Sequence, residues 1–436
     1  IECMARKIEL LLPRGMRDLP AEDAILQQTV LDTIREVFEL FGYCPLETPA
    51  VERMEILTAK FAAGEGTDVS HEIFKVLDQG ERSLGLRFDM TVPLARYIAM
   101  NPTVKLPFKR YAIGKVFRDG PIKLGRYREF WQADGDIVGV AGTIADSEGV
   151  LIAREVFRRL GLEVNIYCSS REILREMMDL LDIPEDSRAK AIIALDKLKK
   201  IGEKEVLKEM KDVAGVSETK AKEFLSLCCL KGSQEERLRT LEEKLPQSHG
   251  LKTIREILAH LNDVPDLHFD PSLARGLTYY TGFFFECVLK KGQITSSLVG
   301  TGRYDRMIGD FLGGEHEIPA VGISFGVSVI CDALKEKGFS LRKTPTQVYL
   351  APVSEKGRSY AMEIQKSLRG HGIRSDVDML ERSPGKNMAY ANALGIPFVI
   401  LVGEKELEEK KVTLKNMESG EQRLLSLEEA IRVVSG

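Results

Sequence analysis

The sequence predicts an α+β protein in which a helical segment interrupts a strand-rich core and a separate α/β domain follows. Three observations indicate this order. Residues 108–139 show the alternation of a long hairpin, residues 171–262 show helical periodicity with few aromatic residues, and residues 346–436 alternate strand and helix patterns. A chain of 436 residues is also too long for one ordinary core, so two or three domains are expected.

The core is expected to begin with a helix and an extended segment. Between residues 21 and 41, apolar side chains recur at helical spacing, and Gly42 supplies a stop. The next stretch, YCPLETPAVE, is predicted to be extended because Pro45 and Pro49 are best tolerated at the edge of a sheet or at an interface.

The predicted hairpin places its charged residues on one face. Because side chains alternate along a strand, Arg110 and Arg118 share one face of the first arm. Gln132, Asp134 and Asp136 share one face of the second arm, and the opposite face carries Trp131, Ala133, Gly135 and Ile137. The apolar face is therefore expected to pack against the protein core, and the opposite face is expected to be polar.

The remainder of the chain is predicted to contain an inserted helical module, a resumed sheet and a terminal domain. Residues 171–262 are rich in Lys, Glu and Leu, and strand-like segments resume at LHFDPSLARGLTYYTGFFFECVL. After the linker SLRKTPT, three strand patterns separated by helices over 357–371 and near 386–394 predict a small, mostly parallel sheet.

Composition excludes several classes of protein. A net charge of −4 does not indicate a generally basic nucleic-acid binder, although a local basic groove remains compatible with it. The seven cysteines contain no CxxC pair, and the six histidines form no HxxxH pattern, so neither a disulfide framework nor a metal site formed by protein ligands is predicted. No apolar stretch approaches the roughly 20 residues that span a bilayer, and a cytoplasmic protein is expected.

Two stretches suggest ligand binding, each with a structural alternative. Arg110, Arg118 and Arg126 suit a phosphate-rich ligand because guanidinium forks bind phosphate oxygens bidentately, although they could instead form salt bridges on a solvated strand. In LARGLTYYTG, Arg275 could bind a carboxylate or phosphate while Tyr279 and Tyr280 line a small aromatic site, or the tyrosines could be packing residues.

A third stretch, VGTGRYDRMIG, is rich in glycine. Its backbone could approach a ligand closely, since glycine has no side chain, or the stretch could be an ordinary turn. No GxxxxGK[ST] motif occurs, so a nucleotide site of the P-loop type is not predicted.

Five pieces in order resemble a known family. GYCPLETPAVE, KVFRDGPIKLGRYREFWQADGDIVG and AVGISFGVSVI resemble the three signatures of class II aminoacyl-tRNA synthetases. LRFDMTVPLARY and LARGLTYYTG narrow the resemblance to the histidyl-tRNA synthetase family, with wording closest to its archaeal and eukaryotic branch. The resemblance covers almost the whole chain.

The resemblance implies a six-stranded antiparallel catalytic sheet flanked by helices, in a homodimer. It divides the chain into a catalytic core, an inserted helical domain and an α/β anticodon-binding domain, over residues 1–170 with 263–338, 171–262 and 345–436 respectively. The implied reaction is ATP-dependent ligation of L-histidine to tRNA(His) through a histidyl-adenylate, with Mg²⁺ accompanying ATP.

When the roles of the family's residues are carried over to the matching positions, the resemblance implies that arginines bind the phosphates of ATP. Arg118 would hold the α-phosphate and Arg126 the terminal phosphates, while Arg275 would contact both the α-phosphate and the carboxylate of histidine. Arg118 and Arg275 are therefore the candidate catalytic residues. The third signature usually carries an arginine in its helix, and this chain has Val329 at that position.

The resemblance assigns histidine to a second set of residues. Asp89, Thr91 and Gln132 match the residues for the α-amino group, and Asp136 with Tyr280 and Tyr127 would bind the imidazole, which is best selected by a hydrogen-bonding partner at each nitrogen. Tyr279 would line the same site.

Other functions stay open at this point. A histidine-sensing regulatory subunit of ATP phosphoribosyltransferase would share the core, but such regulators lack the anticodon domain that residues 346–436 resemble. An RNA-binding scaffold with a decayed active site is a further alternative, supported by Val329. The inserted helices would reach the acceptor stem of tRNA, or they form a solvated appendage.

Overall fold

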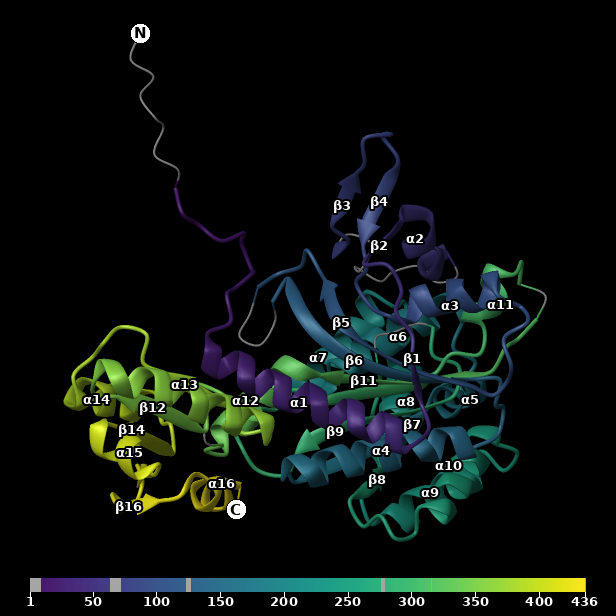
Figure 1. Cartoon of the computed structure of the whole chain (residues 1–436). Coiled ribbons are helices and arrows are strands. Elements are labelled where there is room, and N and C mark those ends of the chain that lie inside the picture. Colours follow the sequence, from purple (N-terminus) through teal and green to yellow (C-terminus); the bar gives the residue numbers. More distant parts are fainter. Residues whose placement is uncertain are drawn as a thin grey trace. The chain divides into compact units, whose positions relative to one another are not determined.

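The computed structural model describes residues 9–62, 72–122, 127–275, 279–314, 316–339 and 341–435 (Figure 1). The chain divides into two compact units, which comprise Val30–Phe339 with the residues up to Arg17, and Ser340–Gly436 with Asp18–Thr29. The helical segment 171–262 belongs to the first unit, and the domain boundaries predicted around it stay predictions.

Over the described residues, the first unit contains an eight-stranded sheet in which six antiparallel strands lie between two short edge strands. Its order is β1 (Cys44–Pro45), β5 (Phe108–Phe117), β6 (Glu129–Val138), β11 (Ala320–Gly326), β10 (Val299–Arg303), β9 (Phe283–Leu289), β7 (Val164–Ser170) and β8 (Leu267–Phe269). The edge strands β1 and β8 pair in parallel with their neighbours. The predicted hairpin and the six-stranded antiparallel sheet are confirmed, and Pro45 lies at the edge as expected.

Two helices cover the apolar face of this sheet. Phe38 of α1 (Ala21–Leu40) and Phe157 of α4 (Ile144–Leu160) both pack against Phe325 of β11, with ring centroids 5.9 and 6.2 Å apart. Both helices follow sequence signals: α1 confirms the predicted helix, and α4 ends at Gly161, which has a φ of 65°. The opposite, polar face of the sheet is therefore left for other functions.

A smaller antiparallel sheet and short helices complete the core. The sheet has the order β2 (Val51–Arg53), β4 (Ser83–Leu86) and β3 (Lys75–Leu77), and β3 and β4 project together at the top of Figure 1. The accompanying helices are α2 (Met54–Ala62), α3 (Thr91–Met100), α11 (Met307–Phe311) and α12 (Val327–Glu336).

The segment predicted to be helical consists of six helices joined by short turns and contains no strand within residues 171–262, all of which are described. Its helices, in teal in Figure 1, are α5 (Arg171–Leu180), α6 (Glu185–Asp196), α7 (Leu198–Asp212), α8 (Glu218–Cys228), α9 (Gln234–Lys244) and α10 (His249–His260). Serine caps begin several of them. Ser233 accepts from the Glu236 amide while the Glu236 carboxylate accepts from the Ser233 amide, which is a capping box at α9.

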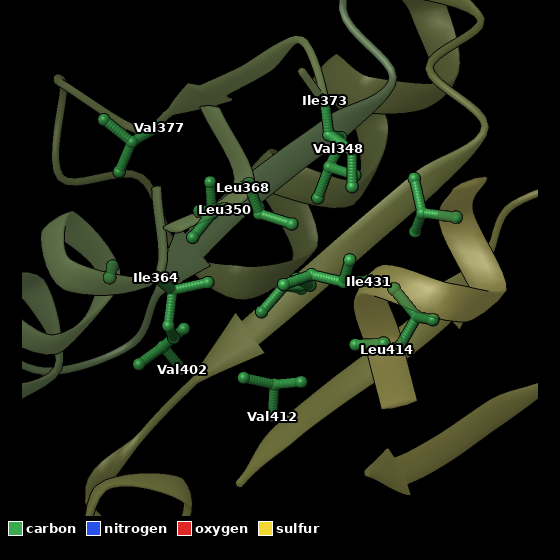
Figure 2. Close-up of a cluster of buried hydrophobic side chains, with 14 residues drawn as sticks. Val348, Leu350, Ile364, Leu368, Ile373, Val377, Val402, Val412, Leu414 and Ile431 are labelled. Carbon is green, nitrogen blue, oxygen red and sulfur yellow. The ribbon is translucent and has the colours of Figure 1, made fainter. Parts of the chain in front are cut away.

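The second unit is a five-stranded sheet with helices. The order is β13 (Ser375–Val377), β12 (Val348–Pro352), β14 (Phe398–Val402), β15 (Val412–Asn416) and β16 (Gln422–Leu425). The helices are α13 (Glu355–Gly370), α14 (Pro384–Leu394), α15 (Glu404–Glu409) and α16 (Leu427–Ser435). Figure 2 shows the buried side chains, including Leu350, Ile364 and Leu414, that join the sheet to its helices.

The predicted mostly parallel sheet is only half correct. The three predicted strands pair in parallel, but β15 and β16 are antiparallel additions. The β15–β16 pairing follows from the tight turn between these two strands, where the Asn416 side chain accepts from the Glu418 and Ser419 amides and Gly420 has a φ of 76°. A connection this short can join only antiparallel strands.

Two further observations concern the residues that the structure describes. No helix among them is long and apolar enough to cross a membrane. Six cysteines lie among them, and four of these are buried.

Candidate active site

A cavity of about 940 Å³ lies over the polar face of the large sheet. Strands β6, β11, β10 and β9 form its floor. Its other lining residues come from distant parts of the chain and include Phe88, Asp89, Thr91, Arg118, Asp196, Lys199, Lys200, Arg275, Tyr279 and Tyr280. The fold therefore brings together residues that the sequence separates widely.

Cross-strand pairing arranges the floor in rows, because directly paired residues in an antiparallel sheet point to the same face. One row crosses four strands through Arg110, Asp136, Gly322 and Gly302. The next row crosses five strands through Ala112, Asp134, Ser324, Gly300 and Glu286. Small residues in the middle of both rows leave space for the cavity, and charged side chains border that space.

The predicted polar face of β6 is confirmed. Gln132, Asp134 and Asp136 all line the cavity. Gly135 faces the other way, where an added Cβ would lie 2.3 Å from the Phe38 ring. The alternation of the sequence therefore separates the ligand-facing side of this strand from its packed side.

Asp136 is held from two sides. Nη2 of Arg110 lies 2.6 Å from its Oδ2, and the Tyr304 hydroxyl donates to its Oδ1 at 2.5 Å. Arg110 and Asp136 are each 1% exposed. Burial raises the pKa of Asp136, while the charge of Arg110 and the Tyr304 hydrogen bond oppose that rise. For Arg110 the salt-bridge interpretation is therefore correct, although the bridge is buried rather than solvated.

Gln132 and Asp134 form a second polar group on the same face. Nε2 of Gln132 donates to Ser324 Oγ at 2.6 Å, and it lies 3.4 Å from Asp134 Oδ1. Among the described residues, the buried Oε1 of Gln132 has no hydrogen-bond partner. Burial raises the pKa of Asp134 to about 7, against a lowering effect of the Ser324 hydrogen bond. This region therefore offers acceptors for a cationic ligand group.

Arg118 directly follows β5 and lines the same cavity. Its Nε donates to the Phe88 carbonyl at 3.1 Å, and its guanidinium carbon lies 5.1 Å from the centroid of the Phe130 ring. These two contacts fix the direction of a guanidinium that is positioned to meet an anionic ligand.

Arg275 lies over β10 on the other side of the cavity. Its Nε is 3.6 Å from Oε1 of Glu286, and its guanidinium lies directly on Gly300, where an added Cβ would be 2.2 Å from Nη1. Within the part of the chain that the structure describes, this buried Nη1 has no hydrogen-bond partner. A ligand oxygen is the natural partner for such a donor.

Tyr280 lies over the same strand. An added Cβ at Gly302 would be 2.3 Å from Cε1 of its ring, and the ring stacks on Phe284 with centroids 6.3 Å apart. In VGTGRYDRMIG the two glycines of residues 299–303 therefore lie in β10, and the turn of this stretch follows at residues 305 and 306. The two glycines of β10 are approached by Arg275 and Tyr280.

Asp89 and Thr91 lie at the start of α3 and line the cavity. Asp89 is 7% exposed, and its Oδ1 accepts from the Val92 amide at 3.1 Å. This hydrogen bond to the first turn of the helix fixes the carboxylate, and the positive end of the helix dipole favours its charge.

Two other predicted positions, Tyr127 and Val329, are not among the described residues that line the cavity. Tyr127 accepts a hydrogen bond from Arg17 at 2.8 Å, and the Arg17 guanidinium lies 3.9 Å from its ring centroid. Arg126 lies outside the described residues. Val329 lies in the first turn of α12, with a methyl group 3.8 Å from where a Cβ of Gly326 would stand.

Sequence reasoning missed several residues of the site. Tyr304 donates a hydrogen bond to Asp136, and Glu286 pairs with Arg275. Lys199 and Lys200, at the start of α7, add positive charge to the lining of the cavity. Alternation within VGTGRYD places Gly300, Gly302 and residue 304 two apart, which is a signal that could have identified the tyrosine. The lysines carry no comparable signal.

The arrangement suits a ligand with both anionic and cationic groups. Arg118 and Arg275 can bind phosphate or carboxylate oxygens, and the acids of β6 can bind an ammonium or an imidazole. Within the described ranges, no three His, Cys, Asp or Glu side chains are grouped so as to hold a metal ion.

Comparison with known families gives two matches. Residues 15–330 match the family model described as histidyl-tRNA synthetase, and residues 347–436 match the model described as an anticodon binding domain. Together the two matches cover most of the chain.

Individual proteins show the same similarity. The histidine–tRNA ligase 2 of Shouchella clausii is 39% identical over 413 residues, which are 93% of this chain and 96% of that protein. The crystal structure of histidyl-tRNA synthetase from Nostoc sp. PCC 7120 has a TM-score of 0.86 and 30% identity, and the match covers 98% of this chain and 99% of that one.

A third structure shares the fold. The structure from Bacillus halodurans described as an ATP phosphoribosyltransferase regulatory subunit/histidyl-tRNA synthetase has a TM-score of 0.74 at 21% identity and covers 91% of this chain and 99% of that one. At that identity the likeness concerns the fold alone. The archaeal and eukaryotic branch suggested by the motif wording stays a prediction, because these three relatives are bacterial.

Proposed function

The chain belongs to the histidyl-tRNA synthetase family, and from this premise we propose how its cavity charges tRNA with histidine. The enzyme is a class II aminoacyl-tRNA ligase with a two-step reaction. The carboxylate of L-histidine attacks the α-phosphorus of ATP, which gives histidyl-adenylate and releases pyrophosphate. A hydroxyl of the terminal ribose of tRNA(His) then accepts the histidyl group, and AMP leaves.

One observation carries the assignment of these steps to the cavity. Guanidinium groups from two distant segments, Arg118 and Arg275, line the same space as the buried acids of β6. Phosphorus gathers negative charge on its oxygens as the carboxylate attacks, and fixed cations aimed there lower the barrier. The arginines are therefore proposed to bind the phosphates of ATP, and the acids to bind histidine.

For the phosphates, Arg118 is proposed to bind the α-phosphate. Arg275 bridges the α-phosphate and the carboxylate of histidine, because its Nη1 is buried without a hydrogen-bond partner in the described part of the chain. Arg126 is proposed to bind the terminal phosphates, although it lies outside the described residues. Arg118 and Arg275 would then act on the reacting atoms directly.

The α-ammonium of histidine is proposed to bind Asp89, Thr91 and Gln132. All three line the cavity, and the unpartnered Oε1 of Gln132, judged over the described residues, is an acceptor that an ammonium can satisfy. Asp89 adds a carboxylate that is already oriented by the first turn of α3.

The imidazole is proposed to lie between Asp136 and Tyr280, beside the ring of Tyr279. Asp136 accepts a hydrogen bond from one ring nitrogen, and the Tyr280 hydroxyl forms a hydrogen bond with the other ring nitrogen. A site that hydrogen-bonds both nitrogens rejects side chains that lack them, because its buried polar groups would be left unpaired. Tyr127 stays in the proposal as a further contact, despite its present hydrogen bond to Arg17.

Mg²⁺ is proposed to enter with ATP. This ion is usually held by one or two carboxylates together with substrate phosphates and water. The cavity offers single acids such as Glu286, and the described residues contain no group of three potential ligands. Single carboxylates of this kind fit an ion that enters bound to the nucleotide. The ion would neutralise charge on the terminal phosphates.

tRNA(His) is proposed to contact two other parts of the chain. The C-terminal unit would bind the anticodon, in keeping with the family model that matches residues 347–436. Helices α5–α10 would approach the acceptor end, because Lys199 and Lys200 of this segment already line the catalytic cavity.

The proposal extends to a cytoplasmic homodimer. The edge strand β1 has large exposed apolar side chains close to it in sequence, Leu40 and Val51, which a second copy could cover. Sedimentation at several concentrations would report a monomer if this part of the proposal is wrong.

Histidine-dependent ATP–pyrophosphate exchange tests the catalytic assignment. Arg275→Ala is expected to keep the fold, as measured by circular dichroism, and to reduce exchange by about 10²-fold or more. Near-normal exchange in this variant would remove Arg275 from the reaction.

Separate titrations of the two substrates test the histidine site. Asp136→Ala is expected to weaken histidine binding by a few kcal/mol, roughly the penalty for an unpaired buried group, and to weaken ATP binding less. The reverse pattern would contradict the proposed division of the cavity.

A further inference from the structure

Two glycines of β10 lie under the two side chains that reach over this strand. A Cβ added to Gly300 would lie 2.2 Å from Nη1 and 2.6 Å from Nη2 of Arg275. A Cβ added to Gly302 would lie 2.3 and 2.4 Å from Cε1 and Cδ1 of Tyr280. Both guanidinium and ring therefore rest directly on the backbone of the strand.

The backbone itself does not require glycine at either position. Neither Gly300 nor Gly302 is among the glycines with positive φ, and both pair regularly with residues of β11. An alanine could adopt this extended conformation without strain. The need for glycine therefore comes from the side chains above the strand.

Each of the two side chains is also held from another direction. Glu286 pairs across the sheet with Gly300 and lies 3.6 Å from Nε of Arg275. The ring of Tyr280 stacks on Phe284 with an interplanar angle of 6°, and Phe284 is 1% exposed. The glycine beneath each side chain sets how closely that side chain approaches the strand, and Glu286 or Phe284 sets its lateral position.

A methyl group on the strand would raise the side chain above it. Non-bonded heavy atoms are most stable at roughly 3.5–4.0 Å, so the group must rise by more than about 1 Å. The guanidinium is the end of a flexible side chain and can move away, which spares the fold. A misplacement of about 1 Å is nevertheless enough to reduce a catalytic rate by roughly 10²-fold.

We propose that Gly300 and Gly302 are positioning residues with separate tasks: Gly300 sets the depth of Arg275 for the activation of histidine, and Gly302 sets the depth of Tyr280 for recognition of the imidazole. This inference rests on the proposed roles of Arg275 and Tyr280. It adds that two positions on one strand control two different kinetic parameters.

The test compares Gly300→Ala and Gly302→Ala in the full-length enzyme by ATP–pyrophosphate exchange, with histidine and ATP titrated separately. Gly300→Ala is expected to lower kcat by roughly 10²-fold and to change the KM for histidine by less. Gly302→Ala is expected to raise the KM for histidine more than it lowers kcat. Wild-type kinetics in both variants would overturn the inference.

Two other glycines provide matched controls. Gly135→Ala creates a similar clash, 2.3 Å from the Phe38 ring, but on the packed face of the sheet, so it is expected to lower the Tm and to keep the ratio of kcat to KM. Gly149→Ala meets Phe285 at an ordinary 3.5 Å and is expected to change neither property. If the β10 variants lose activity only in proportion to their loss of Tm, as expected of a structural role, the inference is wrong.

A double variant separates positioning from general damage. The three atoms nearest to a Cβ at Gly300 all belong to the Arg275 guanidinium, which Arg275→Ala removes, so the double variant is expected to match Arg275→Ala within about twofold. A further loss in the double variant would overturn the positioning role. If Arg275→Ala itself keeps exchange, the proposed function of Arg275 is wrong; if it loses exchange while Gly300→Ala keeps it, only the positioning role is wrong.

Discussion

Replacing Arg110 by methionine is expected to lower the free energy of unfolding by about 3–5 kcal/mol, because it leaves the carboxylate of Asp136 buried without its cation. The two groups are 2.6 Å apart, and each is 1% exposed, so water does not screen their interaction. The hydrogen bond from Tyr304 remains in the variant. A net hydrogen bond to a charged group is worth about 1.5–3 kcal/mol, which does not replace the lost ion pair.

The loss is expected to depend on pH. Burial already raises the pKa of Asp136, and Arg110 opposes that rise, so the pKa increases further in Arg110→Met. A carboxyl with a raised folded pKa holds its proton in the folded state, so its stabilising contribution is present below the unfolded pKa of about 3.9 and is lost as the pH rises through the folded pKa. The deficit of the variant is therefore expected to be larger at pH 8 than at pH 5.

Urea unfolding followed by tryptophan fluorescence measures this deficit. Trp131, the one tryptophan of the chain, lies on the same strand as Asp136, β6, so it reports the transition of the first unit. The double variant Arg110→Met/Asp136→Leu serves as the control, because replacing both charges by apolar groups removes the uncompensated ion. We expect it to recover most of the loss.

Three results would refute this reasoning. The first is a deficit below about 1 kcal/mol, which is typical of exposed pairs. The second is a deficit that is equal at pH 5 and pH 8. The third is a double variant whose loss equals the sum of the two single losses, because additivity means that the two residues do not interact.

Two further predictions concern the same cavity. Because burial raises the pKa of Asp134 from 3.8 to about 7, its contribution to stability is expected to fall between about pH 4 and pH 7 by up to about 4 kcal/mol; Asp134→Asn should flatten the pH dependence of urea unfolding in that window, and an unchanged profile would contradict the assignment. Lys200→Ala is expected to raise the KM for tRNA more than the KM for ATP and to reduce the salt slope of tRNA binding by roughly 1. An unchanged slope, with an unchanged KM for tRNA, would place Lys200 outside the tRNA contact.

The polar face of β6 could be predicted because its signal is local. A strand with one packed side alternates strictly, so the sequence alone places Gln132, Asp134 and Asp136 on one face. The predicted helices α1, α13 and α14 were identified from equally local periodicity and stops. The antiparallel pair β15 and β16 was missed because β16, with the sequence QRLL, is largely exposed and lacks the alternation of a strand with one packed side.

The partners of those residues could not be predicted from local patterns. Asp136 meets Gly322 and Tyr304 only because β6, β11 and β10 become neighbours with one particular register. From the sequence, Arg110 was a candidate for binding phosphate. An arginine in a buried ion pair and an arginine that binds a ligand have the same local sequence pattern. What decides between them is burial, which depends on the whole fold.

The most direct measurement is ATP–pyrophosphate exchange by the full-length enzyme with each of the twenty amino acids in turn. If arginines hold the triphosphate and the acids of β6 select the amino acid, exchange is expected with histidine alone and should fall by about 10²-fold or more in Arg275→Ala. Exchange supported equally by another amino acid, or exchange that survives the loss of Arg275, would contradict the account.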